Sequence, residues 1–94
     1  MFIVNDLETY KDIVKNNNKV IVIFCHAILP LFKELAYKYH TIIFVIVIIN
    51  NADNLAKLFN ITSTPLYYFY HNSNLVKELK LLKESDIKEL ILFS

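Results

Sequence analysis

The chain has no glycine and no tryptophan, and it has only one cysteine and two prolines among its 94 residues. Without glycine, a turn that needs a positive φ angle has to use asparagine or aspartate, which tolerate that conformation better than most residues. A single cysteine excludes an internal disulfide. The lack of glycine also excludes the glycine-rich loops that cradle nucleotide phosphates.

Long hydrophobic segments and targeting signals are also missing. The longest unbroken apolar run, Ile42–Ile49, has eight residues, whereas a membrane-spanning helix needs about 20. Met1–Asp6 lacks the basic region, long apolar core and cleavage site of a secretory signal. Together with the single cysteine, these features predict a cytoplasmic protein that does not enter a membrane.

Neither sign of charge is in excess. Ten basic and nine acidic residues give a net charge of +1, so no strong field attracts nucleic acid or anionic lipid. His26, His40 and His71 lie at the ends of different predicted elements, without the spacing of a zinc site. We therefore expect no metal, no cofactor and no nucleic-acid partner.

Apolar and aromatic residues make up 55% of the chain, enough for the core of one domain that spans residues 1–94. Their periodicity predicts five strands and four helices in the order β-α-β-α-β-α-β-β-α. Asn5, Asn50–Asn51 and Ser85–Asp86 are the predicted helix caps. The predicted strands are Phe2–Val4, Val20–Phe24, Ile42–Ile49, Leu66–Tyr70 and Leu75–Leu79. The apolar stripes of the predicted helices are Leu7–Val14, Ile28 to about His40, Leu55–Phe59 and Ile87–Ile91.

This order of elements predicts an α/β fold. Alternating strands and helices require right-handed crossovers and a largely parallel sheet, while the turn at His71–Asn74 makes the last two strands an antiparallel hairpin. The prediction is therefore a central mixed five-stranded sheet with four helices on both faces.

Three segments carry a family resemblance. Val20–Phe24 is a buried strand, Pro30–Leu35 opens a helix, and Phe59–Pro65 leads into the final hairpin. In this order and spacing, the whole chain resembles thioredoxin. The resemblance implies a thioredoxin-like fold with a cis peptide bond before Pro65. It also implies that Thr64 and Pro65 present backbone hydrogen-bonding groups to a bound peptide.

The chain departs from the thioredoxin pattern at the active site. Thioredoxins place a Trp-Cys-Gly-Pro-Cys loop between the phenylalanine of the strand and the proline of the helix. Here only residues 25–29 separate Phe24 from Pro30, so the Cys-Gly-Pro-Cys loop is missing. Ile23 occupies the position of the buried acid that assists proton transfer in the family, and an isoleucine cannot move a proton.

Two positions in the family pattern are open to Cys25. With a single gap after Ala27, it matches the strand-end tryptophan or a neighbour, and the chain has no catalytic cysteine. With a split gap, it occupies the place of the nucleophile, and Ile28 replaces the resolving cysteine. Reactivity would require an exposed thiolate favoured by the following helix, whereas unpaired cysteines are often buried.

These features favour a redox-inactive thioredoxin-like domain that acts as a protein-binding or structural module through the surface beside Thr64 and Pro65. One cysteine cannot complete the usual dithiol cycle, so whether the chain is an enzyme stays open, with the balance against it. The alternative is a monothiol protein that uses Cys25 in mixed-disulfide exchange or redox homeostasis. A third hypothesis is self-association through Leu75–Leu79 or the first strand, as a monomer or weak dimer.

Overall fold

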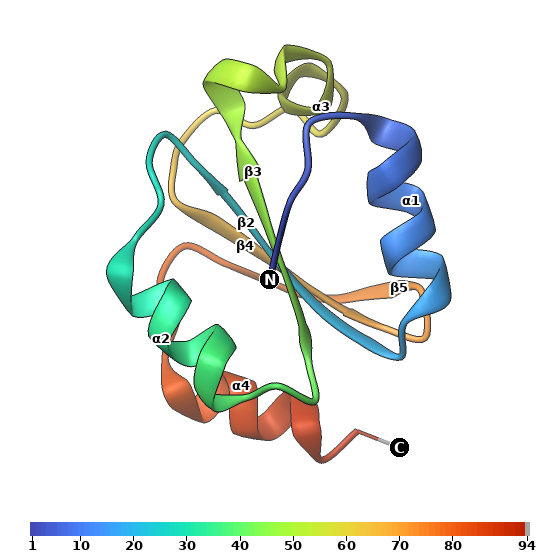
Figure 1. Ribbon diagram of the computed structural model, residues 1–94, viewed down its shortest axis with the longest axis vertical. Helices are drawn as coiled ribbons and strands as arrows, with labels where there is room; N and C mark the ends of the chain where they lie inside the picture. The colour runs from blue at the N-terminus through green and yellow to red at the C-terminus, as the bar shows by residue number, and fades with distance from the viewer. Residues whose placement is uncertain (94) are drawn as a thin grey trace.

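The computed structural model describes residues 1–93, which form one mixed sheet with helices on both faces (Figure 1). The sheet order is β1-β3-β2-β4-β5, with β1 and β2 parallel to β3, and the β4–β5 hairpin antiparallel to β2. The strands are β1 Phe2–Ile3, β2 Lys19–Cys25, β3 Ile43–Ile48, β4 Leu66–His71 and β5 Asn74–Leu79. The helices are α1 Leu7–Asn16, α2 Pro30–Lys38, α3 Asp53–Leu58 and α4 Glu84–Ile91, with a short 3₁₀ helix η1 at Ile49–Asn51.

This architecture confirms the predicted α/β fold with five strands and four helices. Helices α1 and α3 cover one face of the sheet, and α2 and α4 cover the other (Figure 1). None of the helices in residues 1–93 is both long and apolar enough to cross a membrane.

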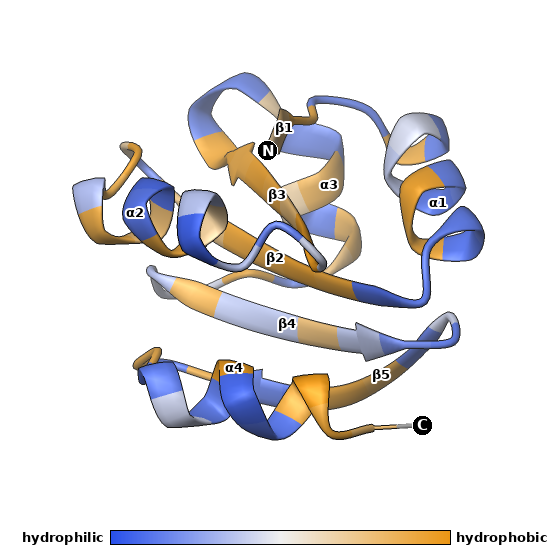
Figure 2. Cartoon of the chain, turned by 60° about the horizontal axis from the view of Figure 1, so that its bottom comes forward, coloured by the Kyte–Doolittle hydropathy of each residue, from blue (hydrophilic) through white to orange (hydrophobic). Residues whose placement is uncertain are grey.

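The central strand β2 contributes to a hydrophobic core on each face of the sheet. Ile21, Ile23 and Cys25 pack with the side chains of α2 and α4, and Val20, Val22 and Phe24 pack with those of α1 and α3. Successive side chains of a strand point to opposite faces, so both sets must be apolar. Figure 2 shows this as an almost continuously hydrophobic β2 between amphipathic helices.

The core under α1 and α3 is rich in aromatic rings. Phe24 packs edge-on against Tyr68. Phe59, which directly follows α3, contacts both Phe24 and Tyr10 of α1. The hydroxyl groups of Tyr10 and Tyr70 lie 2.7 Å apart and form a buried hydrogen bond. This bond joins α1 to β4 across 60 residues of sequence.

All three predicted helix caps differ in the structure. At α4 the N-cap is Lys83, and Ser85 and Asp86 lie inside the helix, because the Asp86 carboxylate at the third helical position reaches back to accept a 3.1 Å hydrogen bond from the Lys83 N–H. The carboxylate of Asp6, not the side chain of Asn5, accepts a 2.9 Å hydrogen bond from the Thr9 N–H at the start of α1. A negative charge is stabilised more than a neutral amide at a helix N-terminus, which explains the shift by one residue. Asn50 and Asn51 form η1 instead of capping α3, whose N-cap is Ala52.

The turns use residues other than glycine at positive φ. Asn60 and Asn72 have φ angles of 53° and 49°, as expected for asparagine, but Ser73 also reaches 70°. The two-residue β4–β5 turn needs positive φ at both of its central positions to match the strand twist. The Ser73 hydroxyl donates to the Val14 carbonyl at 3.4 Å, which attaches the turn to α1.

The buried tyrosine pair leads to a stability prediction. We expect Tyr10→Phe and Tyr70→Phe each to lower the free energy of unfolding by about 1–2 kcal/mol, because each leaves the other hydroxyl buried without its partner. The double variant should cost less than the sum of the two, since it leaves no unpaired hydroxyl. Urea denaturation measures all three, with Tyr37→Phe at an exposed position as the control. Strictly additive effects would contradict the pairing.

Candidate functional site

Cys25 is the last residue of β2, at the carboxyl edge of the parallel part of the sheet. Its side chain is only 3% exposed and lies in the core cluster that includes Phe32 and Leu35 of α2 and Tyr67 of β4. Its Sγ atom lies 4.0 Å from the carbonyl oxygen of Val47. The thiol therefore faces the core beneath α2.

Burial also controls the ionisation of this thiol. Removal from water disfavours the thiolate, and the pKa of Cys25 is raised above its ordinary value by this desolvation. A reactive cysteine needs the opposite change, a lowered pKa beside a positive charge or an exposed helix N-terminus. The surroundings of Cys25 suit an inert apolar side chain.

His26 does not activate Cys25. It is exposed, and its Nδ1 atom lies 3.1 Å from the side-chain oxygen of Asn50 in η1. Only residues 26–29 connect β2 to α2, which begins at Pro30. This connection is too short to include both a dithiol loop and the turn into the helix.

Ile23 is completely buried in the same core cluster as Cys25. The resemblance to thioredoxins placed this residue at the position of a proton-transferring acid. Because its neighbours are apolar and its side chain has no titratable atom, the position contributes packing alone.

Thr64 and Pro65 lie beside the end of β2. The Thr64–Pro65 peptide bond is cis. Phe24 pairs with Leu66 in the antiparallel β2–β4 ladder, so the next step of the register brings Pro65 beside Cys25. Both Thr64 and Pro65 are half-buried. The structure thus brings the three predicted site residues together, with the sulfur directed into the core.

The approach to Pro65 leaves backbone groups free. In residues 1–93, no hydrogen bond joins the backbone of residues 62–64 to another part of the chain. Thr62 and Ser63 are exposed. Exposed backbone groups next to the end of a sheet can bind an extended segment through main-chain hydrogen bonds.

The histidines do not form a metal centre. Within the described part of the chain, no group of three or more His, Cys, Asp or Glu side chains is close enough to hold a metal ion. His71 packs edge-on against Phe93, with ring centres 5.1 Å apart. His26 and His40 belong to other regions of the fold.

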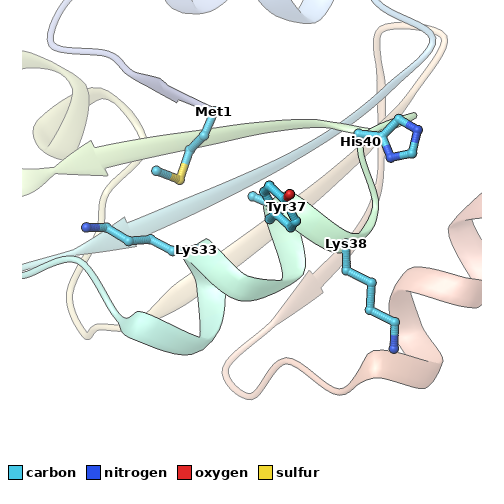
Figure 3. A pocket seen from close by; sticks show the side chains of 6 residues that line it. Met1, Lys33, Tyr37, Lys38 and His40 are labelled. Atoms are coloured by element: carbon cyan, nitrogen blue, oxygen red, sulfur yellow. The ribbon is translucent and has the colours of Figure 1, made fainter.

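A large hollow lies away from the predicted site, between α2 and the start of β1 (Figure 3). We call it the α2–β1 hollow; its volume is about 880 Å³ and its walls are Met1, Lys33, Ala36, Tyr37, Lys38 and His40. The sequence analysis did not identify this region. The available signal was the spacing of Lys33 and Tyr37, which lie one turn apart on α2, with His40 just after the end of the helix.

Comparison with known proteins agrees with the fold. The Thioredoxin family model matches residues 1–92. Thioredoxin-1 of Caenorhabditis elegans is 31% identical over 68 residues, which cover 72% of this chain and 59% of that protein. Thioredoxin 1 of Plasmodium falciparum is 29% identical over 96 residues, which cover 95% of this chain and 92% of that protein.

Solved structures give the same result. A Plasmodium falciparum thioredoxin superposes with a TM-score of 0.81 at 28% identity, covering 97% of this chain and 96% of that one. An Entamoeba histolytica thioredoxin has a TM-score of 0.80 at 18% identity with the same coverage, which indicates a shared fold. With a family match over nearly its whole length, the chain belongs to the thioredoxin family.

Proposed function

We propose that this thioredoxin-family chain is redox-inactive and acts in the cytoplasm as a protein-binding module through the surface beside Thr64 and Pro65. The observation that carries the proposal is the burial of the only cysteine, whose Sγ atom packs against the Val47 carbonyl group under α2. A dithiol reductase releases its partner by attack of a second thiol on the mixed disulfide. This chain has no second thiol.

The same burial argues against a monothiol mechanism. Mixed-disulfide exchange requires a thiolate that a partner's sulfur can approach in line. Cys25 is shielded by α2 and β4, and desolvation raises its pKa. Both access and ionisation thus disfavour the alternative in which Cys25 exchanges with a partner or a small thiol.

The binding part of the proposal rests on the free backbone before Pro65. In thioredoxins, the proline at this position and the residue before it hold a bound peptide through backbone groups. Thr64 and Pro65 occupy that place here, and residues 62–64 keep their N–H and C=O groups without partners among residues 1–93. A peptide can therefore bind here without any chemistry at sulfur.

The first test is the reactivity of Cys25. We expect a disulfide reagent such as dithionitrobenzoate to label the native protein at least about a hundredfold more slowly than the denatured protein, because the thiol is buried and its pKa is raised. The rate should keep rising with pH above the usual thiol pKa. A Cys25→Ser/Ser63→Cys variant, with its thiol on the exposed loop, is the fast-reacting control. Rapid labelling that levels off near neutral pH would instead support the monothiol alternative.

The second test is catalytic turnover. In the insulin-reduction assay with dithiothreitol, we expect the chain to give the same rate as buffer, because it cannot resolve a mixed disulfide. Cys25→Ser is the matched variant and should be indistinguishable from the wild-type chain. An excess rate that disappears in Cys25→Ser would refute redox inactivity.

The third test is peptide binding beside Pro65. The probe is reduced and carboxymethylated insulin B chain, an extended polypeptide without free thiols. We expect it to shift the NMR amide signals of residues 62–64 in a saturable manner, and Ser63→Trp to weaken this binding by about tenfold through steric block. Thr41→Trp, at an exposed loop before β3, is the matched control. Equal binding by both variants would place the contact elsewhere.

A further inference from the structure

The α2–β1 hollow has large apolar side chains that no other part of residues 1–93 covers. Tyr37 is 89% exposed, and Met1 and Ile3 are 54% and 55% exposed. Ile3 pairs with Ile46, which belongs to the core under α2, so Ile3 lies on the α2 side of the sheet. Met1, two residues earlier, lies on the same side. Exposed apolar side chains gathered at one place are typical of an interaction surface.

The polar side chains around these residues are basic or neutral, and none is acidic among the residues that line the hollow. Lys33 and His40 lie at opposite ends of the hollow with Tyr37 between them, whereas Lys38 points toward α4 (Figure 3), where it pairs with Glu84. Within residues 1–93, Lys33 and His40 make no ion pair. In the part of the chain that the structure describes, no carboxylate lines the hollow, and Glu34, the acidic residue of α2, is not part of its wall.

The neighbouring strand offers backbone groups as well. β1 is the outermost strand of the sheet on this side. The Val4 N–H donates to the Ile46 carbonyl at 2.9 Å. Because successive peptide groups of a strand point in opposite directions, the N–H and C=O of Ile3 point away from β3 toward the open edge. An extended segment can pair with them.

We propose that the α2–β1 hollow binds an extended acidic peptide segment of a partner protein. Lys33 lies on α2 and His40 in the turn after it, at opposite ends of the hollow with Tyr37 between them. In an extended peptide, side chains two residues apart lie on one face at about 7 Å, so three alternate side chains can face Lys33, Tyr37 and His40 in turn. Two glutamates can therefore contact Lys33 and His40, while the apolar side chain midway between them packs on Met1 and Tyr37.

A peptide fits these features better than a nucleic acid does. Nucleic-acid binding depends on neutralising several phosphates with a continuous row of cations. Here one lysine and one imidazole flank an apolar centre, and the net charge of the chain is only +1. The surface is distinct from the one beside Pro65, so the inference does not depend on the proposed function.

The test uses fluorescence anisotropy with the labelled peptide Ser-Glu-Thr-Leu-Thr-Glu-Ser. We expect saturable binding that weakens with added salt and that falls by about tenfold in Lys33→Glu and by severalfold in Tyr37→Ser. The matched controls are Lys11→Glu on α1 and Leu58→Ser on α3, which change an exposed lysine and an exposed leucine outside the hollow. Both controls and Ser63→Trp should bind as the wild-type chain does.

Two further probes test whether binding requires negative charge on the peptide and whether a nucleic acid binds as well as the peptide does. A peptide with lysine in place of both glutamates should not bind, and a ten-residue oligothymidine should bind more weakly than the acidic peptide. Loss of binding in Ser63→Trp but not in Lys33→Glu would overturn the proposal in favour of the surface beside Pro65. Equal effects of Lys33→Glu and Lys11→Glu, or tighter binding of oligothymidine, would also overturn it.

Discussion

The fold depends on one constraint, the burial of β2 on both faces. This strand pairs with β3 on one side and β4 on the other, and residues 20–24 have no exposed surface. Each face therefore needs its own layer of helices, because a strand exposed on one side would leave branched apolar side chains in water. The helices are stabilised by this packing more than by their own propensity, since α1, α2, α3 and α4 have ten, nine, six and eight residues.

The same constraint determines the state of Cys25. Strand alternation places it on the face of Ile21 and Ile23, and α2 starts only five residues later, at Pro30. With so short a connection, the helix packs over the end of the strand and covers the sulfur. In a protein with a longer loop at this point, the loop could carry thiols beyond the sheet edge. The short connection and the buried thiol are therefore two aspects of the same local packing.

The sequence predicted those parts of the fold that depend on local periodicity. β2, β3 and β4 stand out because their apolar runs are too dense to be amphipathic, and α1 and α4 show a clear helical stripe. Helix caps were less predictable: Asn5 and Asp6 are adjacent, and each has a side-chain oxygen that can accept a hydrogen bond from the first turn, although the structure uses the charged one. Ser73 could not be foreseen at positive φ, because its conformation follows from the two-residue turn between β4 and β5.

Prediction of the candidate site was limited in the same way, because side-chain packing between distant elements cannot be read from local sequence patterns. The resemblance to thioredoxins identified Thr64, Pro65 and Cys25, and the register of β2 against β4 brings them together. The direction of the sulfur is a tertiary property, because it depends on how α2 packs. The α2–β1 hollow is tertiary as well: the spacing of Lys33, Tyr37 and His40 is visible in the sequence, but β1 meets that side of α2 only through its pairing with β3.

The two candidate surfaces are consistent with a chain whose central cysteine is enclosed. The backbone groups beside Pro65 lie at the start of the interior strand β4, whereas those of Ile3 lie on the outermost strand β1, and neither set involves sulfur. Binding through main-chain groups tolerates changes in the surrounding side chains, because every residue except proline carries the same donor and acceptor. The backbone groups that both proposed surfaces would use therefore depend on strand order and not on a thiol at the β2–α2 connection.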